Sequence, residues 1–136
     1  MRYKKTKINT KPLDQLLKDV KWAFKELAKD LDLEFEAVIE DSGAFADVGL
    51  AGRDIVLSGA LRDSQKMKVV SEGGSIKYTW EWDPVDPDTG YHYAYDVFVG
   101  FVSQSGNFIP GRNWPGKAVD RIEPILYLKK KLKEKK

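Results

Sequence analysis

Few side chains in this sequence have the chemistry of a catalytic or metal site, and their spacing does not assemble one. His92 is the only histidine, so no site built on two histidine ligands can form. There are no cysteines, which excludes disulfides and thiolate metal centres. The sequence also lacks the glycine-rich patterns GxxxxGK(S/T) and GxGxxG, whose backbone amides bind phosphate. We therefore expect no catalytic residues, no metal and no cofactor, and hence no enzyme.

An acidic segment, DPVDPDTG at residues 83–90, comes nearest to a ligand site. Its three aspartates, Asp83, Asp86 and Asp88, loosely resemble a calcium-binding loop. The segment lacks the twelve-residue pattern and the terminal bidentate glutamate of such loops, so we expect no metal there. Its two prolines and glycine instead predict a surface loop. We take Asp86, Asp88 and the following Tyr91 as candidate interface residues.

Alternating residues give the strongest structural signal. Between residues 76 and 83, aromatic and β-branched side chains alternate with polar ones, which is typical of a strand with one buried face. The run Gly73–Gly74–Ser75 permits a tight turn, so we predict a hairpin over residues 66–83. A lone hairpin is only marginally stable, and we expect helices to cover its apolar face. That face comprises Ile76, Tyr78, Trp80 and Trp82.

The aromatic residues of this region admit three interpretations. They could form the core, a surface for protein contacts, or a platform that stacks bases or sugars. Alternation with charged residues favours the core. The residues concerned are Trp80, Trp82, Tyr91, Tyr93 and Tyr95.

Helical periodicity is clear toward both ends of the chain. Apolar residues at spacings of three and four predict an amphipathic helix from near Thr10 to about Asp41, or two helices joined near residues 31–33. A C-terminal helix is predicted to begin at Asn113 or Trp114. Pro124 should interrupt or kink it.

The fold class that follows is α+β. A long N-terminal amphipathic helix and a C-terminal helix are expected to pack on a small antiparallel β-sheet built around the hairpin. The apolar segment 91–102 could add either a strand or a short helix. A chain of 136 residues fits a single domain, residues 1–136.

The formal net charge of +2 conceals an uneven distribution. Residues 1–11 carry five basic side chains and the last eight residues have a net charge of +5, so the body between them carries −8. Flexible basic ends, residues 1–10 and 129–136, suggest an anionic partner, either nucleic acid or an acidic protein surface, although solvated tails are the simpler interpretation. Lys129, Lys130 and Lys131 are therefore candidate interface residues. We expect neither a signal peptide nor a membrane span.

Several short motifs occur here in the order found in one known family. The segment LSGALRDSQ, residues 57–65, predicts a helical turn capped by Ser58, with Leu61 inward and Arg62 outward. It resembles the TG-x-LR-x-S signature of small tail-completion, or neck, proteins of long-tailed bacteriophages, with serine in place of the usual threonine. That family continues with a β-hairpin, an aromatic segment ending in glycine, and an RPW-like motif that opens the last helix. The matching residues are Ser58, Gly59, Leu61, Arg62 and Ser64, then Tyr93, Tyr95 and Gly100, and finally Arg112, Trp114 and Ala118, with Asn113 where the family usually has proline.

The resemblance implies a virion component without catalytic residues. Proteins of this family form rings, commonly sixfold, at the junction between the DNA-filled head and the tail. The implied partners are further copies of the chain, head-closure or connector proteins, tail-tube or tail-terminator proteins, and DNA that passes through the channel without sequence-specific binding. The implied location is the neck or tail of the virion, after assembly in the cytoplasm of the bacterial host. An acidic body suits such a channel, because like charge suppresses phosphate binding.

A small nucleic-acid-binding module is the alternative, using lysine-rich tails and an aromatic sheet. Such a sheet should interleave Lys and Arg with its exposed aromatic residues. Residues 79–96 contain no Lys or Arg and carry Glu81 and four aspartates. This argues against nucleic acid on the sheet and leaves only the tails.

Overall fold

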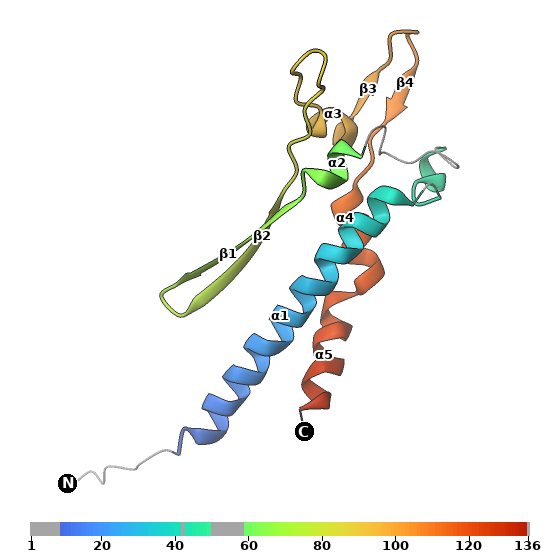
Figure 1. Cartoon of the computed structure of the whole chain (residues 1–136). Helices are drawn as coiled ribbons and strands as arrows, with labels where there is room; N and C mark the ends of the chain where they lie inside the picture. The colour runs from blue at the N-terminus through green and yellow to red at the C-terminus, as the bar shows by residue number, and fades with distance from the viewer. Residues whose placement is uncertain (1–8, 42, 50–58, 136) are drawn as a thin grey trace, which may run out of the picture.

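The computed structural model describes residues 9–41, 43–49 and 59–135, which form helices and two small antiparallel hairpins (Figure 1). The elements in chain order are α1 (Lys11–Glu40), the 3-10 turn η1 (Ala46–Val48), α2 (Ala60–Asp63), β1 (Lys66–Glu72), β2 (Ser75–Glu81), α3 (Ala94–Val99), β3 (Gly100–Val102), β4 (Phe108–Pro110), α4 (Trp114–Ile122) and α5 (Pro124–Glu134). The expected α+β class is confirmed. The strands, however, form two separate two-stranded sheets.

The helix α1 is uninterrupted over 30 residues, which decides between the one-helix and two-helix predictions. No proline or glycine breaks its apolar stripe, which is buried between residues 23 and 39. Thr10 occupies the N-cap position as expected, but its hydroxyl donates to the Asp14 carboxylate (3.4 Å) rather than capping a backbone amide. After the helix, the Asp41 carboxylate accepts a hydrogen bond from the Gly43 N–H (2.8 Å), and the chain turns there.

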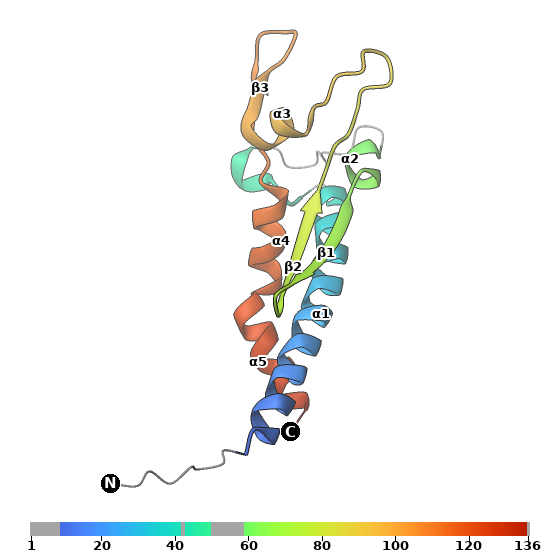
Figure 2. The same ribbon diagram turned by 90° about the vertical axis from the view of Figure 1, so that its left-hand side faces the viewer.

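The helices α4 and α5 run back along α1 (Figures 1 and 2). Asn113 caps α4, because its side-chain oxygen accepts a hydrogen bond from the Gly116 N–H (2.8 Å). The helical conformation is interrupted at Glu123, whose φ of 53° lies in the left-handed region. Pro124 then starts α5. The predicted interruption at Pro124 is confirmed.

The C-terminal end differs from the flexible tail that we expected over residues 129–136. The helix α5 continues to Glu134, and the Nζ atoms of Lys131 and Lys135 lie 5.8 and 4.3 Å from the ring centroid of Trp22 in α1. Such cation–π contacts favour an ordered helix. Of the expected N-terminal tail, residues 1–8 lie outside the described residues.

The first hairpin forms close to its predicted boundaries. Both residues of the 73–74 turn are glycines with positive φ (54° and 84°), as a two-residue hairpin turn requires. The register pairs Met67 with Trp80 and Val69 with Tyr78, so these side chains share one face of the sheet.

Only the base of that face is covered by a helix. Phe35 of α1 meets the rings of Trp80 and Trp82 edge-on, with centroids 5.1 and 5.2 Å apart. Both tryptophans are half-buried, whereas Val69 and Ile76, nearer the turn, are exposed. The expectation that helices cover the whole apolar face is therefore wrong, because the hairpin diverges from α1 toward its turn (Figure 1).

The ambiguous segment 91–102 forms both of the structures considered for it, since α3 leads directly into β3. Gly100 permits this change: its φ is 98°, and a Cβ there would lie 2.8 Å from the Ile109 carbonyl oxygen. After β4, the N–H of the half-buried Arg112 donates to the Val97 carbonyl (2.9 Å). This bond ties the returning chain to α3.

The core lies where α1, α2, α3 and α4 meet. Trp114 at the start of α4 is buried there, and Trp82 packs against the same cluster from the hairpin. The buried members are Leu27, Leu31, Phe35, Val38, Ile39, Ala44, Phe45, Leu61, Val97, Trp114 and Ala118.

We predict that Phe35→Ala lowers the free energy of unfolding by about 3–5 kcal/mol, because it removes the ring beneath two tryptophans and leaves a cavity. Phe35 is 4% exposed, whereas Phe24 in the same helix is 44% exposed. Phe24→Ala should therefore cost less than about 1 kcal/mol. Denaturant melts measure both changes, and equal losses would contradict the packing described.

Candidate interaction surfaces

The signature segment, residues 59–64, forms the joint between α1, α2 and the first hairpin. Gly59 is the N-cap of α2, with a φ of 77° in the left-handed region that favours glycine. Leu61 points into the core as predicted and is 1% exposed. The Ser64 hydroxyl donates to the Leu61 carbonyl (2.8 Å) and accepts from the Asp83 N–H (3.2 Å). Ser64 therefore connects the two ends of the hairpin.

Arg62 points outward, as predicted, and connects α2 to the end of α1. Its guanidinium contacts Glu40 (2.6 Å) and Asp63 (3.1 Å), and the hydrogen bond to Glu40 raises the pKa of Arg62. Solvent screens these pairs because all three side chains are accessible, so they orient the turn more than they stabilise it. Ser58, the predicted cap of this turn, lies outside the described residues.

The signature segment and the motif around Trp114, which both resemble the tail-completion family, meet in the core. Trp114 meets Trp82 and Phe98 edge-on, with centroid separations of 5.6 and 5.9 Å, and it belongs to the same buried cluster as Leu61. Asn113 stands where the family motif has proline. Here it is the N-cap of α4, and its side chain holds the start of the helix.

A polar network beneath the hairpin was not foreseen from the sequence. The Gln65 amide nitrogen donates to the backbone oxygen (2.8 Å) and the carboxylate (2.9 Å) of Asp32. That carboxylate accepts from the Trp80 N–H (3.0 Å), and the Gln65 amide oxygen accepts from the Trp82 N–H (3.0 Å). Both indole N–H groups are therefore satisfied at the edge of the core. The sequence signal for this network is Asp32, an aspartate among the apolar residues of α1.

An ion pair fastens α4 to the end of α1. The Arg121 guanidinium contacts Asp41 (2.7 Å) and Glu34 (3.5 Å). The hydrogen bond from Arg121, and after it the bond from the Gly43 N–H, holds the pKa of Asp41 below its usual value of 3.8. The folded state therefore favours the ionised form of Asp41.

The acidic loop between β2 and α3 is organised by its own side chains. The Asp86 carboxylate accepts from the Asp88 N–H (2.9 Å), and the Asp86 N–H donates to the Tyr91 carbonyl (2.8 Å). The Tyr91 hydroxyl donates to Asp96 (2.6 Å), and this bond raises the pKa of Tyr91. Asp88 and Tyr91 are exposed and accessible to a partner, while Asp86 is half-buried.

His92 and Tyr95 lie at the surface, whereas Tyr93 is half-buried and packs against the core. The His92 Nδ1 atom lies 2.6 Å from the Asp83 carboxylate. Tyr95 is exposed, as Tyr91 is, so the core interpretation fails for these two tyrosines. Within the described ranges, no group of three or more His, Asp or Glu side chains could hold a metal ion.

The three candidate lysines of α5 differ in their surroundings. Lys129 and Lys130 are exposed, whereas Lys131 is half-buried over the ring of Tyr127 (5.6 Å). The Tyr127 hydroxyl donates to Asp30 of α1 (2.5 Å). Burial, and after it this hydrogen bond, raises the pKa of Tyr127. Lys129 and Lys130 are therefore the pair best placed to meet a partner.

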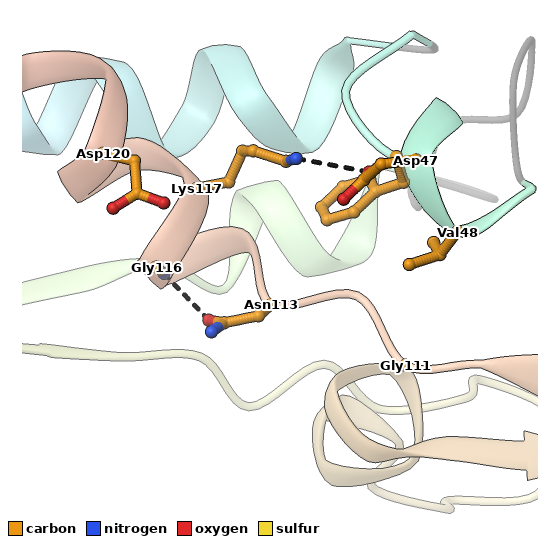
Figure 3. Close-up of a pocket in the computed structure, with 8 residues that line it drawn as sticks. Asp47, Val48, Gly111, Asn113, Gly116, Lys117 and Asp120 are labelled. Carbon is orange, nitrogen blue, oxygen red and sulfur yellow. Dashed lines mark hydrogen bonds and ion pairs between the residues drawn. The ribbon is translucent and has the colours of Figure 1, made fainter.

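A surface pocket of about 350 Å³ lies between η1 and the start of α4 (Figure 3). The Lys117 ammonium contacts the Asp47 carboxylate (3.3 Å) and lies 5.8 Å from the Phe45 ring centroid. Asn113 already caps the helix that opens onto the pocket. The Lys117 ammonium is paired with Asp47, and the Gly116 N–H at the start of α4 is bonded to Asn113. We therefore assign no ligand to this pocket.

Exposed apolar side chains are the most prominent surface feature. Among the described residues, 21 large apolar side chains are exposed, which exceeds the 13 apolar residues that are buried. Many gather on the first turns of α1, the first hairpin, and α3 with the second hairpin. Large exposed apolar areas usually mark contacts with other proteins. Examples are Leu13, Leu16 and Leu17, then Met67, Val69 and Ile76, and finally Tyr95, Val102 and Phe108.

Comparison with protein-family models, with curated proteins and with solved structures found no match. In the part of the chain that the structure describes, no helix combines the length and the apolarity needed to cross a lipid bilayer. Function is therefore inferred from the surfaces described above and from the resemblance of the motifs to the tail-completion family.

We predict that Gln65→Met costs about 1–3 kcal/mol of unfolding free energy, because it leaves the Trp82 N–H and the Asp32 oxygens without this partner at the edge of the core. Gln15→Met is the control, since Gln15 is exposed and bonds only Asp19 in α1 (3.0 Å). Denaturant melts should show little change in the control. Equal effects would mean that the network does not hold the hairpin.

Asp41→Asn should destabilise the chain at neutral pH and have a diminishing effect in acid. The pKa of Asp41 is lowered in the folded state, so its ionised form contributes stability above its unfolded pKa, and that contribution is lost as the pH falls through the folded value. Denaturant melts of both proteins from neutral pH to about pH 3 measure the difference. A difference that stays constant into acid would contradict the role of the charge.

Proposed function

We propose that this chain is a structural subunit of the neck of a long-tailed bacteriophage, where copies form a ring at the head–tail junction through which DNA passes. The ordered motifs support this by their resemblance to the tail-completion family. The extent of exposed apolar surface also supports it, since a subunit completes its packing in an assembly. The partners in this proposal are further copies and the neighbouring head-closure, connector, tail-tube or tail-terminator proteins.

The apolar face of the first hairpin is the observation that carries the proposal. Val69 and Ile76 lie on the same face as Trp80, but toward the turn and exposed. Among the described strands, β1 and β2 pair only with each other, so each has an unpaired edge. A two-stranded sheet with an open apolar face is marginal alone, and a partner that covers the face or pairs with an edge stabilises it.

The family motifs serve this proposal as structural elements. Leu61 and Trp114 share the core, and Ser64 connects the two ends of the hairpin. Together they hold the base of the hairpin in a defined position against α1. A subunit that projects an arm toward its neighbours needs such a joint, and it needs no catalytic group.

The charge of the chain is compatible with a DNA channel. Residues 78–111 contain no Lys or Arg and carry Glu81 and four aspartates. The body between the two basic ends carries −8, and a ring whose channel is lined by such a body repels phosphate and lets DNA pass without binding.

A nucleic-acid-binding module remains the second candidate, and one observation favours it. Lys131 and Lys135 of α5 lie on Trp22 of α1, so basic residues from both ends of the described chain share one region. Binding of duplex DNA by the isolated chain, with a steep dependence on salt, would support this candidate over the first.

Val69→Glu should abolish ring formation and incorporation into particles, because assembly would bury a carboxylate against apolar surface. It should leave the melting temperature nearly unchanged, since Val69 is 53% exposed in the folded chain. Val70→Glu is a matched control: Val70 is the adjacent residue, 43% exposed, on the opposite face of the same strand. The measurements are thermal melting, electron microscopy of the purified protein, and complementation of particles that lack the wild-type chain.

Two results would count against the proposal. If both variants enter particles as the wild-type chain does, the apolar face of the hairpin is not an assembly surface. If the wild-type chain is absent from purified particles, the proposed function is wrong.

A further inference from the structure

Basic and acidic side chains are separated along the length of the molecule. The helix α1 has 30 residues, which corresponds to roughly 45 Å. Its N-terminal half and the C-terminal end of α5 lie at one end of the molecule, and the loop after β2, α3 and the second hairpin lie at the other, in both views (Figures 1 and 2). We call these the basic end and the acidic end.

The basic end comprises residues 11–25 and 124–135. These two segments contain nine lysines and three acidic residues, a net charge of +6. They lie side by side, because Lys135 stacks on Trp22. Lys129 and Lys130 are exposed there. Folding thus unites charges that are about a hundred residues apart in the sequence.

The acidic end comprises residues 82–111. This segment has four acidic residues and no Lys or Arg, a net charge of −4. Asp83 lies against His92, and Asp96 accepts the Tyr91 hydroxyl. Asp88 is exposed at the tip of the loop. The segment supplies no lysine or arginine of its own to neutralise these carboxylates.

Both ends present apolar side chains beside their charges, which favours a protein partner. A phosphate backbone binds mainly through charge and hydrogen bonds, whereas protein interfaces combine an apolar centre with a polar rim. The exposed apolar residues are Leu13, Leu16, Leu17 and Ile125 at the basic end, and Tyr91, Tyr95, Val102 and Phe108 at the acidic end.

We propose that the basic end of one copy binds the acidic end of the next copy, head to tail. This inference rests on the proposed function in that the chain must self-assemble, and it adds which surfaces meet. A second copy fits because the two ends carry opposite charge, +6 and −4. A contact between two different surfaces closes into a ring when its rotation allows, and otherwise continues as a filament.

The test uses two variants of the full chain, each altered at one end. The first combines Lys129→Glu with Lys130→Glu, and the second is Asp88→Lys. Each alone should self-associate about tenfold more weakly than the wild-type chain at about 0.05 M salt, with a smaller difference at about 1 M. An equimolar mixture should regain association, because each variant retains the end that the other lacks. Sedimentation velocity over a range of concentrations measures this.

The control variant combines Lys66→Glu with Lys77→Glu, both exposed on the first hairpin and on its face opposite to Val69 and Ile76. It changes the net charge as much as the Lys129 and Lys130 variant does, and it should associate like the wild-type chain. Equal loss in the control, or no recovery in the mixture, would overturn the head-to-tail contact. Recovery in the mixture alone distinguishes it from a contact between two identical surfaces.

Titration with a short DNA duplex examines the other partner that a basic surface could take. Loss of DNA binding in the Lys129 and Lys130 variant, with self-association unchanged, would assign the basic end to nucleic acid and overturn the proposal. The particle assay is independent. Association through the ends by a chain that never enters particles would contradict the proposed function alone. Assembly unaffected by either charge variant would contradict the head-to-tail contact alone.

Discussion

The edge-to-face contact between Phe35 and the two hairpin tryptophans is the interaction on which the rest of the structure depends. Trp82 also contacts Trp114, and Trp114 contacts Phe98. One series of rings therefore joins α1, the first hairpin, α4 and α3. Each aromatic pair contributes about 0.5–1.5 kcal/mol beyond the area that it buries. These ring contacts, together with the hydrogen bonds to Asp32, attach the hairpin to α1.

Hydrogen bonds determine how the aromatic residues are oriented. The Trp80 and Trp82 indoles lie at the edge of the core, where an unpaired N–H would cost about 1–3 kcal/mol. Asp32 accepts from the Trp80 N–H, Gln65 accepts from the Trp82 N–H, and the Gln65 amide nitrogen also donates to Asp32 of α1. Gln65 directly follows the signature segment. The segment that resembles a phage-protein signature thus positions the residue that fixes the hairpin on the long helix.

The completed fold leaves more apolar surface and more charge separation than a lone domain needs. The helices pack only against the base of the hairpin, while Val69 and Ile76 remain exposed. Charge is likewise sorted, with lysines at one end of α1 and carboxylates beyond the other. Both features are explained if the free chain is one part of a larger assembly, since interfaces use apolar centres for affinity and charge for register.

Local patterns in the sequence determined the long helix, the hairpin with its glycine turn, the interruption at Pro124 and the α+β class, because periodicity, turn residues and proline act over a few neighbours. Tertiary structure alone decided what depends on distant partners. The Asp32–Gln65 contact spans 33 residues, and the contacts of Lys131 and Lys135 with Trp22 join α5 to α1. The hairpin's alternation required a buried face, but only the angle between hairpin and α1 decided how much of it is covered. That angle follows from packing at Phe35, which no local pattern records.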